Sequence, residues 1–258
     1  MIKIENIKEV LEKIEEKQKE ERKATRLVNV NFGYGQDLCY LSDMENIEVG
    51  DLVTVEGKKE DEIGIVKTVR KSFKMPKFEM KWIESVVNRD VSGDYFKLDE
   101  DMVSLNATLT AEQFISMSIG VKYKENQAIG EEILDVELEN FEENELFDNE
   151  LVKNRGKELY KAKAVKFISL QDGVGKAIVR GGEWYEIDFG YANGKITYLA
   201  CVCPYFEECK HEVALLYKLR ELLKKLAKKT NKGNFVACAK DYFGGILALG
   251  KGRIALEL

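Results

Sequence analysis

A short cluster of metal-binding residue types constrains this chain more than any other feature. Three of its five cysteines and its single histidine stand within the eleven residues Cys201–His211. A structural zinc ion takes four nitrogen or sulfur ligands in a tetrahedron, and Pro204 with the loop after it allows the chain to reverse between two ligand pairs. The alternatives are a redox Cys-x-Cys pair or buried thiols that merely lie close, and neither needs His211. We expect Cys39 and Cys238 to be ordinary buried thiols.

The residues on both sides of the cluster predict the elements that carry it. Lys195–Ala200 has the pattern of a strand and leads into the first cysteine. Apolar residues at helical spacing predict a helix over Glu212–Lys229. Cys209 and His211 therefore stand at or just before the N-terminus of this helix.

In their order along the chain, these strands, the ligand spacing and the helix resemble the SWIM zinc finger, whose pattern is Cys-x-Cys followed by Cys-x-His. The resemblance covers about residues 156–229 and includes the glycine turn within Ala177–Phe189. It implies a module of β-hairpins plus a helix that holds one structural Zn²⁺. By this resemblance the ligands are Cys201, Cys203, Cys209 and His211. Four protein ligands leave zinc no open coordination position, so we expect no enzymatic activity.

Charge divides the chain near residue 150. Residues 1–150 carry 20 basic and 35 acidic side chains, a net of −15, whereas residues 151–258 carry 20 basic and 11 acidic, a net of +9. Between Glu131 and Glu150, ten of twenty residues are acidic and none is basic. Self-repulsion predicts a solvated linker here. The alternative is an acidic arm that competes with nucleic acid for the basic half.

These patterns predict an α+β protein of four parts. They are an amphipathic helix at 1–24, a small antiparallel β-barrel-like module at 25–130, an acidic connector at 131–152 and a SWIM-type zinc module at 153–258. We expect the zinc module to end in a hairpin of Phe243–Leu249 and Arg253–Leu258. The first helix carries apolar residues at the a/d spacing of a short coiled coil, which indicates either docking on its own domain or self-association. These residues are Ile4, Ile7, Leu11 and Ile14.

Apolar residues recur with a period of two after the first helix, which predicts a small β-barrel. The predicted strands are Leu27–Phe32, Asp37–Leu41, Leu52–Val55 and Ile63–Val69. Residues 27–69 resemble the small barrel of primosomal helicases that captures a DNA 3′ end, although the same pattern also occurs in barrels of unrelated function. Thr110 and Gln113 form a capping-box pattern, so we expect a short helix over residues 111–118 to close this module.

A second basic cluster follows the barrel strands. Its aromatic side chains are Phe73, Phe78 and Trp82. Its basic side chains are Lys67, Arg70, Lys71, Lys74, Lys77 and Lys81. Interleaved cations and rings suit a nucleic-acid groove, because phosphates attract cations and bases stack on rings. The alternative is a strand-to-helix connection whose aromatic side chains belong to the core.

The favoured function is nucleic-acid (DNA) binding through the basic C-terminal half. The candidate contacts on or just after the predicted helix are Lys218, Lys224, Lys225, Lys228, Lys229 and Lys232. A solvated helix face is the alternative for these lysines, and a protein-interaction adaptor is the rival function. No window holds the roughly 18 apolar residues of a membrane helix, and Met1–Lys23 has no apolar signal core. We therefore expect a cytoplasmic protein with no membrane partner.

Overall fold

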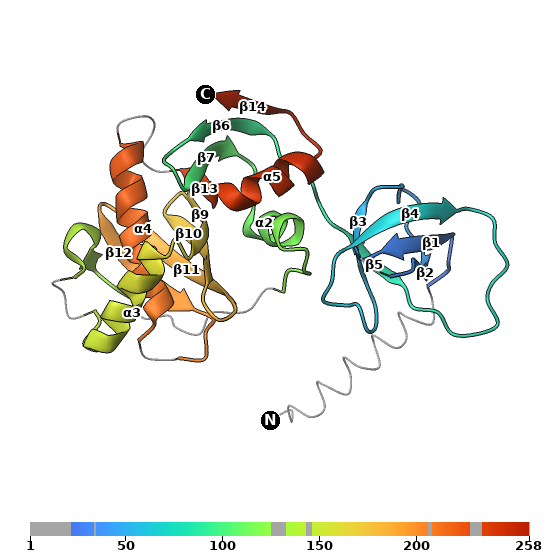
Figure 1. Cartoon of the computed structure of the whole chain (residues 1–258), viewed down its shortest axis with the longest axis horizontal. Helices are drawn as coiled ribbons and strands as arrows, with labels where there is room; N and C mark the ends of the chain where they lie inside the picture. Colours follow the sequence, from blue (N-terminus) through green and yellow to red (C-terminus); the bar gives the residue numbers. More distant parts are fainter. Residues whose placement is uncertain are drawn as a thin grey trace, which may run out of the picture. The chain divides into compact units, whose positions relative to one another are not determined.

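The computed structural model describes residues 22–33, 35–124, 133–142, 146–205, 208–227 and 234–257. The chain forms two compact units (Figure 1), the first made of Met1–Val87 with Gly120–Lys122 and the second of Asn88–Ile119 with Tyr123–Leu258. Antiparallel sheets and helices are both present, which confirms the α+β class. The self-association residues Ile4, Ile7, Leu11 and Ile14 lie outside the described residues.

The first unit is a five-stranded sheet that nearly closes on itself. Alternate residues point inward, so that Val28, Val30 and Val66 are fully buried in one core. Leu41 bridges to Trp82 and thereby joins the β2 edge to the segment that precedes β5 at the opposite edge. The predicted barrel-like module is therefore present. Its strands, in the order β2-β1-β4-β3-β5 across the sheet, are β1 (Arg26–Asn31), β2 (Leu38–Ser42), β3 (Leu52–Val55), β4 (Gly64–Arg70) and β5 (Ile83–Val86).

The second unit is built on a nine-stranded sheet in the order β14-β6-β7-β13-β9-β10-β11-β12-β8. Neighbouring strands are antiparallel except for β14 and β6, which are parallel. The strands are β6 (Gly93–Lys97), β7 (Met102–Ala107), β8 (Val136–Glu137), β9 (Val165–Gln171), β10 (Val174–Arg180), β11 (Trp184–Ala192), β12 (Lys195–Cys201), β13 (Phe235–Ala239) and β14 (Ile254–Glu257).

Helices pack on both faces of this sheet (Figure 1). Phe114 of α2 stacks on Phe167 of β9 with ring centroids 5.1 Å apart, whereas Ile168, the next residue of β9, lies in the core that the α4 leucines fill. Adjacent strand residues point to opposite faces, so α2 and α4 cover different sides. The helices are α2 (Ala111–Ser118), the 3₁₀ turn η1 (Leu138–Asn140), α3 (Glu150–Lys161), α4 (Lys210–Leu226) and α5 (Lys240–Leu249).

The boundary between the units differs from the predicted one. Helix α2 has the predicted ends and the predicted capping box, in which the Thr110 hydroxyl accepts from the Gln113 N–H at 3.2 Å. However, α2 belongs to the second unit, together with β6 and β7. Strand β7 pairs with β13 near the other end of the chain, with Val103 opposite Cys238. The units therefore divide after Val87, because sheet pairing outweighs proximity in sequence.

The acidic segment is folded where the structure describes it, so the prediction of a solvated linker is wrong for residues 133–142 and 146–150. Leu138, Phe141 and Phe147 are buried in the core of the second unit. Strand β8 pairs with β12 at the sheet edge. These three apolar side chains stand between the acidic ones and pack the segment onto the core of the second unit, because burial of each side chain stabilises the fold by about 1.5–3 kcal/mol.

The predicted terminal hairpin is also wrong. Residues 240–249 form α5, which buries Phe243 and Ile246 on one side, and β14 adds parallel to β6. A Cβ atom at Gly252 would lie 2.1 Å from the Val91 carbonyl oxygen, so this glycine allows the chain to pass close to residue 91. The adjacent Gly244 and Gly245 weaken the helical signal in the sequence. Among the described residues, no helix combines the length and apolar character needed to cross a membrane.

Candidate metal centre

Strand β12 and helix α4 position the four predicted ligands. Cys201 is the last residue of β12, and Cys203 follows it in the turn. Cys209 is the N-cap of α4 and His211 lies in its first turn. The Cys209 sulfur accepts the His211 backbone N–H at 3.3 Å, as an N-cap side chain does. The helix start thus fixes the second ligand pair while the strand end fixes the first.

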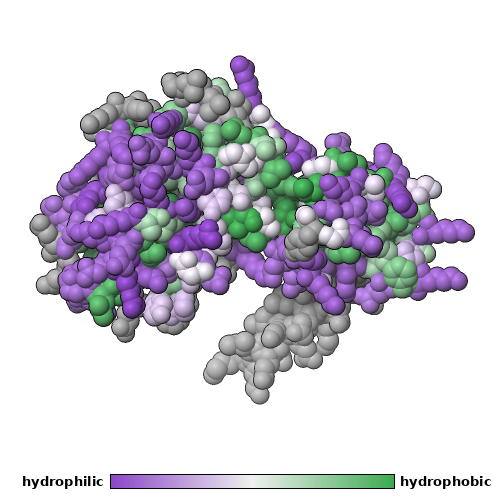
Figure 2. Space-filling model, in the orientation of Figure 1, coloured by the Kyte–Doolittle hydropathy of each residue, from purple (hydrophilic) through white to green (hydrophobic). Residues whose placement is uncertain are grey.

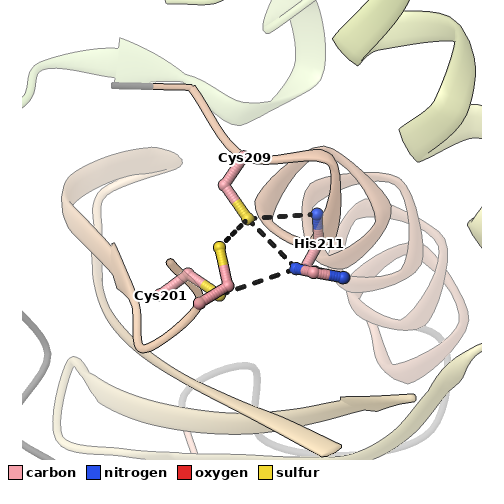
Figure 3. Close-up of side chains that lie close together, drawn as sticks. Cys201, Cys209 and His211 are labelled. Atoms are coloured by element: carbon pink, nitrogen blue, oxygen red, sulfur yellow. Dashed lines mark hydrogen bonds between the residues drawn. The ribbon is translucent and has the colours of Figure 1, made fainter. Parts of the chain in front are cut away.

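The four side chains converge on one point. Figure 3 shows Cys201, Cys209 and His211 pointing toward one another. The Sγ atoms of Cys203 and Cys209 lie 3.2 Å apart. The Nδ1 atom of His211 lies 3.3 Å from the Cys209 sulfur and 3.9 Å from the Cys201 sulfur. All four ligand atoms lie within 4.8 Å of one another, and all four residues are buried.

This arrangement fits one metal ion with four ligands. Zn–S bonds of about 2.3 Å place the sulfurs of a tetrahedron about 3.8 Å apart. The sulfurs of Cys203 and Cys209 lie somewhat closer, at 3.2 Å, and all four ligand atoms lie within 4.8 Å of one another. Three sulfurs and one imidazole nitrogen are the donors of a common structural zinc type. The structure therefore brings together a site that can hold one metal ion.

The thiols influence one another's ionisation. The hydrogen bond with Cys201 lowers the pKa of Cys209, and His211 adds to this effect. The same hydrogen bond, together with burial, raises the pKa of Cys201, and burial raises the pKa of Cys203. A metal binds cysteine as the deprotonated thiolate, so metal binding at this site releases protons.

Two residues beside the site were not singled out as site residues from the sequence. The Tyr185 ring stacks on the His211 imidazole with centroids 4.2 Å apart. A Cβ atom on Gly181 would lie 2.5 Å from His211 Nε2, a separation no real Cβ adopts. Gly181 therefore leaves room for the imidazole, and Tyr185 holds its orientation. The glycine turn between two predicted strands was the available signal, but only the fold places it against His211.

The predicted nucleic-acid contacts on α4 are engaged in ion pairs where the structure describes them. Lys218, whose side chain is 9% exposed, pairs with Asp99 at 3.2 Å and with Glu221 at 3.1 Å. Lys225 pairs with Asp99 at 2.7 Å, and Lys224 pairs with Glu139 at 2.5 Å. Lys228, Lys229 and Lys232 lie outside the described residues.

The acidic segment supplies part of this neutralisation. The Glu142 carboxylate accepts from Arg220 at 2.7 Å and from the Tyr217 hydroxyl at 2.6 Å. The hydrogen bond from Tyr217 lowers the pKa of Glu142, and Arg220 lowers it further. Glu139 pairs with Lys224 in addition, so the acidic segment contacts the basic helix α4. Such a contact is compatible with the alternative hypothesis of an acidic arm. Competition with nucleic acid stays a prediction.

The two remaining cysteines differ from each other. Cys238 is fully buried in β13, as predicted, and burial raises its pKa to about 12. Cys39 is exposed in β2, which corrects the prediction of a buried thiol. It lies at the edge strand of the first unit, on the face opposite to the buried Tyr40.

Comparison with known proteins adds no relative. No protein-family model, curated protein or solved structure matches the chain. The cluster of three cysteines and one histidine is thus the feature on which any functional argument for the second unit rests.

Proposed function

We propose that the chain is a non-enzymatic SWIM-type protein in which Cys201, Cys203, Cys209 and His211 hold one structural Zn²⁺. The observation that carries the proposal is the convergence of four buried ligand atoms within 4.8 Å. Bound zinc would join the end of β12 to the start of α4. Its binding energy, on the order of 10 kcal/mol in comparable peptides, would then be folding energy of the second unit.

Metal analysis tests the zinc site directly. Protein prepared without chelator should contain about one zinc per chain, because the described residues offer one cluster of four ligands. Cys203→Ala should lose the metal and most of the helical circular-dichroism signal. Cys39→Ala is the matched control and should keep both, since Cys39 lies exposed in the first unit. Metal-free wild-type protein with intact α4 would contradict the site.

We further propose that nucleic acid is the ligand of this protein. The support is the positive charge of residues 151–258 and of the cluster at residues 67–81. The ion pairs on Lys218, Lys224 and Lys225 reduce the charge that α4 has available for phosphates. The contribution of this region to nucleic-acid binding therefore depends on the lysines that follow α4, Lys228, Lys229 and Lys232.

Fluorescence anisotropy with labelled single- and double-stranded 20-mers tests this second proposal. Binding should weaken steeply as salt rises from about 50 to 200 mM, because contacts to phosphates release counterions. No binding to either oligonucleotide at 50 mM salt would contradict the proposal and favour the rival function, a protein-interaction adaptor.

A further inference from the structure

We infer that residues 67–81 of the first unit form a binding surface for single-stranded nucleic acid. The inference rests on the proposed function for its ligand class, but it assigns the contact to a different unit from the zinc site. The segment begins within β4 and continues as an irregular loop until Trp82 bridges to Leu41.

Both ends of this loop are anchored in the barrel. Arg70 is the register partner of Leu27 at the end of β4. At the other end, the Leu41 N–H donates to the Lys81 carbonyl at 2.9 Å, and the Arg22 guanidinium lies 4.4 Å over the Trp82 ring. Fixed ends reduce the ordering cost when a ligand binds the loop between them.

The charge of the segment is available to a ligand. Residues 67–81 hold six basic side chains and one acidic, a net of +5, and all six basic side chains are exposed. Within the described part of the chain, Lys81 pairs with Glu79 at 3.2 Å, whereas the other five cations have no carboxylate partner. Hydrophilic side chains stand out from the first unit, at the right of Figure 2. Unpaired exposed cations can bind the phosphates of a nucleic acid, and this binding is favoured because it releases the counterions condensed on the phosphates.

Apolar side chains are exposed among these cations. Phe78 is 72% exposed and Met75 is 61% exposed, and Phe73 is half-buried. None of the three belongs to the core of the first unit. The sequence left open whether the aromatic residues of this cluster are core residues, and the structure shows that Phe78 is not. An exposed ring beside cations is the arrangement on which unpaired bases stack.

The neighbouring face of the sheet is polar. Asn29 of β1 is the register partner of Thr68 on β4 and of Cys39 on β2. Thr68 and Cys39 are exposed and Asn29 is half-buried, while Val28 and Val66, which flank this row, point into the core. This row therefore extends the basic and aromatic segment with groups that can form hydrogen bonds.

A single strand matches this combination better than other anions do. Its phosphates suit the unpaired lysines and its unstacked bases suit Phe78, whereas a duplex hides the base faces. An anionic membrane would attract the lysines but would gain nothing from the polar row of Thr68 and Asn29. The surface therefore favours a single strand, of DNA or RNA.

The test uses the full, zinc-loaded chain with labelled dT20, rU20 and a 20-base-pair duplex, and with phosphatidylcholine vesicles that contain phosphatidylserine. The variant K71Q/K74Q/K77Q should bind a single strand at least about tenfold more weakly, with a salt slope smaller by about two. F78L should also weaken binding about tenfold, while F78W should restore it, because the ring is what stacks. The triple variant K228Q/K229Q/K232Q removes the same number of charges from the lysines that follow α4, and it should weaken single-strand binding less than K71Q/K74Q/K77Q does.

The outcomes separate this inference from the proposed function. If K71Q/K74Q/K77Q binds as the wild type does and K228Q/K229Q/K232Q does not bind, the inference is overturned and the proposed function stands. A wild-type protein that binds no oligonucleotide overturns both. Equal affinity for duplex and single strand, or binding to vesicles alone, overturns the single-strand assignment. Thermal unfolding of each variant should match the wild type, because these side chains are exposed.

Discussion

The two basic regions of this chain have opposite surroundings. On α4, Lys218 and Lys225 share the carboxylates of Asp99 and Glu221, and Lys224 pairs with Glu139. In residues 67–81, only Lys81 has an ion pair among the described residues. Both regions are dense in lysine, yet only the second presents most of its charge to solvent. A count of basic residues therefore does not measure the charge that a ligand meets.

The origin of the α4 partners explains the difference. Asp99, Glu139 and Glu142 all come from the acidic half of the sequence, residues 1–150. The fold brings them beside the basic helix, so the two opposite net charges partly cancel within the second unit. No such acidic segment pairs with residues 67–81 in the described structure.

Removal of zinc should have the largest effect and should separate the two regions. Chelation should unfold the second unit, which would lose on the order of 10 kcal/mol of metal-binding energy, while the barrel and its basic segment stay folded. Hydrogen exchange measured by peptide checks this. Amides in α4 should lose protection and those in β3 and β4 should keep it. Equal loss of protection in both units would show that the regions do not fold separately.

Substitution of Asp99 tests the paired region next. Burial opposes ionisation of Asp99, but hydrogen bonds from Lys225 and from two backbone N–H groups outweigh it and hold its pKa well below the ordinary value. Asp99→Asn leaves buried Lys218 with Glu221 alone, and should cost the second unit about 3 kcal/mol, as measured by denaturant unfolding. Asp101→Asn is the control and should cost under about 1 kcal/mol, because its partner Lys163 is exposed.

The same carboxylate predicts an acid dependence. The pKa of Asp99 is lower in the folded state than in the unfolded chain, where it is about 4. The stability that ionised Asp99 contributes is therefore fully present above pH values of about 4, and it is lost as the pH falls toward the folded-state pKa. The wild-type second unit should therefore lose more stability between pH 5 and pH 2 than Asp99→Asn does. Parallel loss in both proteins would show that Asp99 carries no such linkage.

Neutralisation of exposed lysines should have the smallest effect on stability. K71Q/K74Q/K77Q should change the free energy of unfolding by less than about 0.5 kcal/mol, because these side chains have no partner to lose. Lys224→Gln should cost about 0.5 kcal/mol, the value of an exposed ion pair. A larger cost for the triple variant would mean that the segment has a structural role, which would weaken the contrast between the regions.

Local patterns predicted the local structure well. The capping box at Thr110 gave α2 with its observed ends, and strand β3 has the predicted limits. The α4 helix begins two residues before the predicted start, because Cys209 itself is the cap. These features depend on neighbours within a few residues, which the sequence displays directly.

Long-range pairing was not predictable in the same way. Strands β6 and β7 follow the barrel in sequence, but β7 pairs with β13 and β6 with β14. Phe243 and Ile246 stand three residues apart with two glycines between them, and this short pattern does not by itself decide between a strand and a helix. In the fold, the segment is the helix α5, which packs against α2. Nothing local distinguishes these alternatives, since the deciding contacts come from the other end of the chain.

By itself, the sequence predicted the cluster of Cys201, Cys203, Cys209 and His211 as a metal site, because chemistry restricts which residue types bind metals and their spacing restricts how they meet. It also determined the α+β class, since periods of two and of 3.6 are properties of the local chain. The tertiary structure alone decided where the units divide and which lysines are free. Those outcomes depend on contacts between distant segments, such as Asp99 with Lys218, that bury or expose a charge according to the fold.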